Sequence, residues 1–142
     1  MGSKILGPAG VLAGLVGVNF GLPKVIYRGL IGLQRKLAGL RTLRLTVDGH
    51  EMVYLDGGRG DPLLLIHGFA SNARVNWWDT SWVKTLTEAG RRVITFDHRG
   101  HGASEKLYES ALYPAAEMAE DARRLLDHLA IGQADVMGYS MG

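Results

Sequence analysis

The sequence predicts an α/β fold in which an antiparallel hairpin leads into a parallel sheet with flanking helices. Three observations predict it. Asp48-Gly49 is a turn signal between two short strand-like segments. Three later apolar runs are separated by helical patterns, the order typical of parallel strands joined by crossover helices. With 46% hydrophobic and 21% charged residues among 142, the composition is that of a globular protein.

The expected elements follow in chain order. Residues 43–47 and 52–55 are the hairpin strands, and the glycine-rich residues 56–62 are a loop. Residues 63–66 form a continuous apolar run, as in a strand that is buried on both faces. The next two strands are residues 93–96 and 134–139. A helix is expected over 82–89 with Gly90 as its C-terminal cap, and a longer helix begins at Pro114.

Several side chains can be assigned to core or surface. In the longer helix one apolar stripe predicts the buried face, and the charged residues, Asp121 among them, lie mainly off it. His50 and His128 are expected at the surface of a strand and a helix. The three tryptophans, which follow the first apolar run, are expected to pack against the sheet: Trp77, Trp78 and Trp82.

Residues 1–40 form an N-terminal extension of different composition from the domain expected over residues 41–142. Residues 5–23 carry no charge, and glycines recur there every three or four positions. Residues 1–47 hold seven basic residues and no acidic one, a balance that suits an anionic membrane surface. Two interpretations stay open: a membrane anchor within residues 5–37 with the body on the cytoplasmic side, or a soluble or disordered extension.

Several classes of site are excluded or disfavoured. The chain has no cysteine, which excludes disulfides and thiolate metal sites. His98 and His101 have a spacing seen in metal sites, but no third ligand lies near them in the sequence, so no metal is expected. The basic residues are spread thinly without a recognition motif, so no nucleic-acid partner is expected.

Three polar or glycine-rich segments directly follow the apolar strands: residues 67–72, 97–104 and 138–142. Because the carboxyl ends of parallel strands meet at one edge of a sheet, we expect these segments to lie together and to bind a ligand. The last one, Gly138-Tyr139-Ser140-Met141-Gly142, has the G-x-S-x-G pattern of a nucleophilic serine on a tight strand-to-helix turn. Ser140 is therefore the candidate nucleophile, and Gly138 and Gly142 keep the turn free of side chains.

Together with His67-Gly68-Phe69 and the segment from Asp97 to Ser104, this pattern resembles the N-terminal half of the α/β-hydrolase superfamily, in its esterase, lactonase and C–C hydrolase branch. The resemblance covers residues 41–142. It implies that the backbone N–H groups of Phe69 and Met141 form the oxyanion hole for a substrate attacked by Ser140. It also implies supporting roles for His67, Gly68, Asp97 and Arg99, and contact of Phe69 and Tyr139 with the substrate.

The activity implied by the resemblance is hydrolysis of a small ester-like substrate through an acyl-serine intermediate, without a cofactor. C–C hydrolase, lactonase, thioesterase and cofactor-free haloperoxidase chemistry stay open, whereas serine in place of aspartate argues against an epoxide hydrolase. In this family an acid and a histidine follow the serine, and the chain has neither. We therefore expect an inactive front part of a longer hydrolase. The alternative is a truncated, non-catalytic chain that binds a membrane or a partner.

Overall fold

The computed structural model describes residues 25–26, 29, 32–33 and 40–142. Contacts divide the chain into two units, Met1–Arg35 and Lys36–Gly142, and the fold described below is that of the second unit. The expected membrane anchor at 5–37 lies outside the described residues except at five positions, so it stays a prediction, as does the domain boundary after residue 40. No helix in the described part of the chain is long and apolar enough to cross a membrane.

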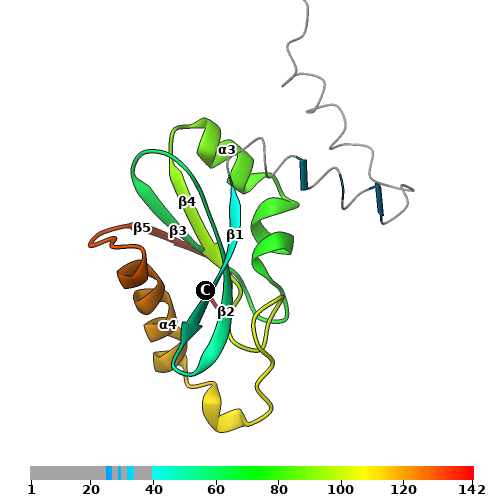
Figure 1. The fold of residues 1–142 in the computed structure, drawn as a ribbon, viewed down its shortest axis with the longest axis vertical. Helices are drawn as coiled ribbons and strands as arrows, with labels where there is room; N and C mark the ends of the chain where they lie inside the picture. Colours follow the sequence, from blue (N-terminus) through cyan, green and yellow to red (C-terminus); the bar gives the residue numbers. More distant parts are fainter. Residues whose placement is uncertain (1–24, 27–28, 30–31, 34–39) are drawn as a thin grey trace, which may run out of the picture. The chain divides into compact units, whose positions relative to one another are not determined.

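The described part of the second unit is one five-stranded mixed sheet with helices on its faces (Figure 1). The strands are β1 (Arg41–Val47), β2 (His50–Gly58), β3 (Pro62–Ile66), β4 (Arg92–Phe96) and β5 (Asp135–Gly138), in the spatial order β1-β2-β4-β3-β5. β2 is antiparallel to both β1 and β4, whereas β3 is parallel to β4 and β5. This confirms the predicted hairpin leading into a parallel sheet.

The hairpin turn has the geometry that its sequence predicts. Asp48 and Gly49 both have positive φ, 49° and 82°, as a two-residue turn that matches strand twist requires. β2 is longer than expected, because residues 56–58 continue the strand where their composition predicted a loop. They pair with β4, and Arg92 donates two hydrogen bonds of 2.9 and 2.8 Å to the Asp56 carboxylate. Tertiary pairing therefore overrides the low strand propensity of the glycines.

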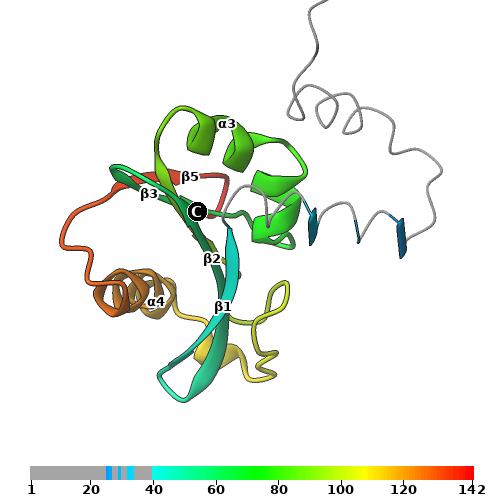
Figure 2. The same cartoon turned by 45° about the horizontal axis from the view of Figure 1, so that its top comes forward.

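Helices cover both faces of the sheet (Figure 2). α4 (Ala115–His128) packs on one face, and α3 (Trp82–Glu88) with the short turn η1 (Arg74–Trp78) lies on the other. A second short turn, η2 (Ser110–Leu112), precedes α4. The apolar run of β3 divides between the two cores: Leu64 packs under α4, whereas Leu63 and Leu65 pack under α3 and η1. The prediction that this strand is buried on both faces is confirmed.

Some of the surface assignments are wrong. His50 is only 6% exposed and Asp121 is fully buried, because each faces a polar partner inside the fold that sequence periodicity does not reveal. Trp77 is buried as expected and Trp78 is partly buried, but Trp82 is 46% exposed. The neighbouring Val83 takes the inward position of α3, and successive helical residues point about 100° apart. His128 is exposed, as expected.

Candidate active site

Ser140 lies on a tight turn directly after β5. Its φ of 58° is in the left-handed region, which is uncommon for a residue with a side chain and is typical of strained functional turns. The Tyr139 N–H donates to the Ile66 carbonyl at 3.0 Å, and the Gly142 N–H donates to the Tyr139 carbonyl at 3.0 Å. A side chain at Gly142 would collide with the Ile66 carbonyl, and one at Gly138 with the backbone of Gly142. The glycines thus permit the turn.

The segment after β3 lies against this turn at Gly68. A Cβ atom on Gly68 would be 3.2 Å from the Ser140 Cβ and 3.1 Å from the Tyr139 carbonyl oxygen, so only glycine allows this approach without displacement. The next N–H group, that of Phe69, makes no hydrogen bond within the described residues, and the same holds for the Met141 N–H. Two backbone donors are therefore free beside the serine turn.

His67 holds the peptide that carries the first of these donors. Its Nδ1 is 2.8 Å from the Gly68 carbonyl oxygen, and the His98 N–H donates to its Nε2 at 3.0 Å. Because the carbonyl only accepts, Nδ1 carries the proton, and a single neutral tautomer satisfies both contacts. The Gly68 carbonyl and the Phe69 N–H share one peptide plane and point in opposite directions, so fixing the carbonyl fixes the donor. Burial lowers the pKa of His67, which preserves this neutral form.

Asn76 is a second anchor of the same loop that sequence reasoning missed. Its side-chain Oδ1 accepts a hydrogen bond of 2.9 Å from the Gly68 N–H. Asn76 lies in η1, whose backbone turn is tied to the loop by the Asn76 N–H to Asn72 carbonyl bond of 3.1 Å. The peptides on both sides of Gly68 are therefore held by side chains. Only the proximity of an asparagine to the His-Gly pair in the sequence could have suggested this.

Asp97, directly after β4, joins the segments that follow β3 and β4. One carboxylate oxygen accepts from the Ala73 N–H and the other from the Ala103 N–H, each at 2.8 Å. Its carbonyl accepts from the Ser104 hydroxyl at 2.6 Å. The carboxylate fills the space that a side chain on Gly102 would need. Asp97 therefore braces the loop that leads into η1 against the loop after β4.

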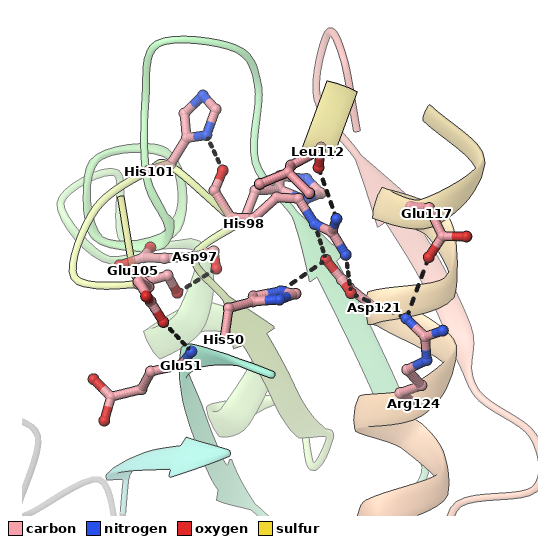
Figure 3. Close-up of polar contacts among 12 residues, drawn as sticks. His50, Glu51, Asp97, His98, His101, Glu105, Leu112, Glu117, Asp121 and Arg124 are labelled. Carbon is pink, nitrogen blue, oxygen red and sulfur yellow. Dashed lines mark hydrogen bonds and ion pairs between the residues drawn. The ribbon is translucent and has the colours of Figure 1, made fainter. Parts of the chain in front are cut away.

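Arg99 is buried and pairs with Asp121 of α4, and Figure 3 shows Asp121 facing the loop after β4. Arg99 makes two hydrogen bonds of 2.7 Å to the Asp121 carboxylate of α4 and one of 2.7 Å to the Leu112 carbonyl. His50 of β2 points toward the same carboxylate, with its Nε2 3.7 Å from Asp121 Oδ2. Hydrogen bonding to Asp121 raises the pKa of Arg99. The sequence predicted a supporting role for Arg99 but did not reveal Asp121, its partner on the helix.

The rings of His98 and His101 pack beside the ring of His67. The His98 ring is buried, and its centroid lies 4.7 Å from that of His67 and 4.9 Å from that of Phe96. Neither of its ring nitrogens has a hydrogen-bond partner among the described residues. Burial lowers the pKa of His98 to about 4. Within residues 40–142 and the five earlier described positions, no group of three or more metal-binding side chains is found.

The open side of the site is apolar and aromatic. Phe69 is 73% exposed, Tyr139 is 58% exposed, and Tyr139 packs over Gly68. None of the described histidines makes a hydrogen bond to Ser140, and the ring nitrogens of His67 are both engaged. The arrangement can present a hydroxyl and two backbone donors to a carbonyl group, but the described residues contain no base placed to take the serine proton.

Comparisons with known proteins agree with this geometry. The sequence model of the alpha/beta hydrolase fold family matches residues 61–142. The chain is 36% identical over 97 residues to the non-heme chloroperoxidase CPO-A1 of Kitasatospora aureofaciens, covering 68% of this chain and 34% of that protein. It is 40% identical over 98 residues to the rhodomycin D methylesterase DauP of Streptomyces sp. strain C5, covering 65% and 32%.

Among solved structures, the chain is similar to the epoxide hydrolase VrEH1 from Vigna radiata. The TM-score is 0.66 at 25% sequence identity, over 73% of this chain and 33% of that one. The chain thus spans about a third of the length of the relatives it matches.

Proposed function

The chain belongs to the alpha/beta hydrolase fold family, and from this premise we propose that it supplies the nucleophile and oxyanion-hole part of a serine hydrolase that acts on carboxylic esters. The observation that carries the proposal is the close approach of Gly68 to Ser140, with the free N–H groups of Phe69 and Met141 beside them. The methylesterase among the relatives supports ester chemistry.

In the proposed reaction the Ser140 Oγ attacks the ester carbonyl carbon, and the carbonyl electron pair moves onto its oxygen. The Phe69 and Met141 N–H groups donate to the resulting oxyanion, and loss of one such donor costs about 10²–10³ in rate. The oxyanion then collapses, the C–O bond to the alcohol breaks, and the alcohol leaves with a proton. Water attacks the acyl-Ser140 carbonyl in the same way and releases the acid.

The proton of Ser140 needs a base, and the described histidines do not suit this role. Both ring nitrogens of His67 are engaged in holding the segment after β3 that carries the Phe69 N–H, and His98 is a weak base with a pKa of about 4. We propose that the base and its carboxylate partner come from a segment other than residues 40–142. Loss of these groups from a serine hydrolase lowers turnover by about 10⁶, so we expect residues 40–142 without such a base to turn over esters slower by about that factor.

Added imidazole tests the proposal by supplying the missing base from solution. We expect a fluorophosphonate probe to label the chain slowly, and the rate to rise in proportion to imidazole concentration. The Ser140→Ala variant loses the label, whereas Ser110→Ala, which removes another exposed serine, keeps it. Mass spectrometry of the labelled peptide identifies the site.

The outcome separates two hypotheses. Labelling of Ser140 that depends on imidazole supports a nucleophile placed beside a formed oxyanion hole. Labelling no faster than that of Ser140→Ala, even at high imidazole concentration, contradicts the proposal and favours the non-catalytic chain that binds a membrane or a partner.

A second chemistry, cofactor-free haloperoxidation, is favoured by the relatives named as non-heme chloroperoxidases. Bromination of a diketone with hydrogen peroxide, bromide and acetate, assayed on the same imidazole-supplemented chain, distinguishes it from ester hydrolysis. Under the proposal ester hydrolysis is the faster reaction, and both require Ser140.

A further inference from the structure

His101 is the one residue of the histidine cluster that the site described above does not use. It lies on the loop after β4, apart from the Asp121 network (Figure 3). Its Nδ1 is 2.9 Å from the Arg99 carbonyl oxygen. Since that oxygen can only accept, Nδ1 carries the proton, and the Nε2 of the neutral ring keeps its lone pair. Nε2 makes no hydrogen bond within the described residues.

The ring of His101 forms one end of an aromatic surface that begins at the serine turn. Its centroid is 5.9 Å from the Phe69 ring, at an interplanar angle of 72°, and 5.3 Å from His67. Phe69 directly follows Gly68, which in turn touches Tyr139 and Ser140. A group that extends from the proposed oxyanion position over Phe69 therefore reaches His101.

We propose that His101 determines specificity, and that the site takes aromatic carboxylic esters with a hydroxyl group on the ring. The aromatic ring of the ester packs on the exposed face of Phe69, and its hydroxyl donates a hydrogen bond to His101 Nε2. This inference rests on the proposed function, since it assumes that the ester carbonyl lies between Ser140 and the Phe69 N–H.

Two physical arguments support this substrate class. The side chain of Phe69 is 73% exposed, so it favours a flat apolar ligand. Pairs of aromatic rings prefer centroid distances of 4.5–7 Å. His101 is half-buried, and its Nε2 gains a hydrogen bond when a ligand hydroxyl donates to it. A site that pairs with a ligand hydroxyl binds the analogue without that hydroxyl less tightly. The hydrogen bond from Nδ1 to the Arg99 carbonyl holds the loop, whereas Nε2 makes no structural contact among the described residues.

The test measures binding and does not depend on turnover. Methyl 4-hydroxybenzoate and methyl 4-methoxybenzoate, which differ in the hydroxyl donor, are titrated into the full chain by calorimetry. We expect the hydroxy ester to bind about three- to tenfold more tightly, the effect of one neutral hydrogen bond. His101→Phe keeps a ring beside Phe69 but loses the acceptor, and it should bind both esters equally.

The control His128→Phe replaces an exposed histidine on α4 and should keep the preference, whereas Phe69→Ala should weaken both esters alike. Equal binding of the two esters to the wild-type chain, no measurable binding of either, or a preference that persists in His101→Phe overturns the inference. Labelling of Ser140 is measured separately. If labelling occurs without the preference, only this inference fails; if labelling is absent, the proposed function fails.

Discussion

Arg99 and Asp121 form a buried ion pair on which the loop after β4 depends. Their side chains are 3% and 0% exposed, so neither charge has access to water. Removing one partner from such a pair leaves the other charge buried and uncompensated, which costs far more than loss of a surface pair. Asp121 therefore stabilises the fold because its carboxylate compensates the buried charge of the Arg99 guanidinium.

We expect Asp121→Ala to lower the free energy of unfolding by about 3–5 kcal/mol. Asp127→Ala provides a matched control on the same helix, because Asp127 pairs with Arg123 at the surface. Such exposed pairs contribute at most about 1 kcal/mol. Urea denaturation of both variants measures the difference, and equal destabilisation would contradict the proposed role of burial.

His98 makes the stability of the fold depend on pH. Its pKa in the folded chain is about 4, below the ordinary value of 6.5, because burial disfavours the charged ring. The unfolded chain therefore binds a proton first as pH falls. We therefore expect the free energy of unfolding to be unaffected by His98 above about pH 6.5 and to fall by about 3 kcal/mol between pH 6.5 and 4. The lowered pKa of His67 acts in the same direction.

His98→Phe removes this titration. Because neither ring nitrogen of His98 has a hydrogen-bond partner in the described part of the chain, the substitution breaks no side-chain hydrogen bond there. At pH 7 we expect the free energy of unfolding of the variant to lie within about 1 kcal/mol of that of the wild-type chain. Between pH 6.5 and 4.5 the variant should lose less of it. Urea denaturation across this pH range checks both points, and an unchanged pH slope would assign the dependence to other groups.

At the scale of elements, η1 connects the loop that carries Phe69, the proposed oxyanion donor, to the rest of the fold. Its Trp77 is buried in the core, and its Asn76 accepts a hydrogen bond from the Gly68 N–H. One short turn therefore anchors the segment beside Ser140 to the hydrophobic core. A five-residue turn is too short to be stable alone, and the core contact keeps it in place.

We expect Asn76→Ala to slow the imidazole-dependent labelling of Ser140 about tenfold, because loss of the acceptor at Gly68 costs about 1–3 kcal/mol. Asn76→Asp keeps an oxygen acceptor at the same position and should recover most of the rate. The thermal midpoints of the two variants serve as the control. Equal rates in Asn76→Ala and the wild-type chain would show that labelling of Ser140 does not need the bond between Asn76 and Gly68.

At the scale of the whole molecule, β5 is an edge of the described sheet. It pairs with β3 alone, and its Val136 is 59% exposed. Such an edge offers unpaired backbone groups to another copy of the chain. We therefore expect self-association that grows with protein concentration in sedimentation velocity, and Val136→Lys should suppress it. Val75→Lys, at an exposed position on η1, is the control and should leave association unchanged.

The sequence predicts those features whose signals are local. The runs of β3 and β4 are apolar enough to identify strands, and the Asp48-Gly49 pair determines its own turn. The signal fails where a distant partner decides the structure. Asp121 looks like a solvent-facing residue until Arg99, 22 positions earlier, is placed against it. The roles of His50 and Asn76 likewise depend on contacts between separate elements.

The strand order has a consequence for the order of events during synthesis. The β1–β2 hairpin contains only local contacts and can form within microseconds. β3 is different, because both of its neighbours, β4 and β5, are made after it. At 5–20 residues per second, the ribosome takes several seconds between Ile66 and Gly138. β5, which leads into the serine turn, is thus the last strand of the described sheet to be made, and the edge of β3 that pairs with it stays unpaired in the nascent chain until then.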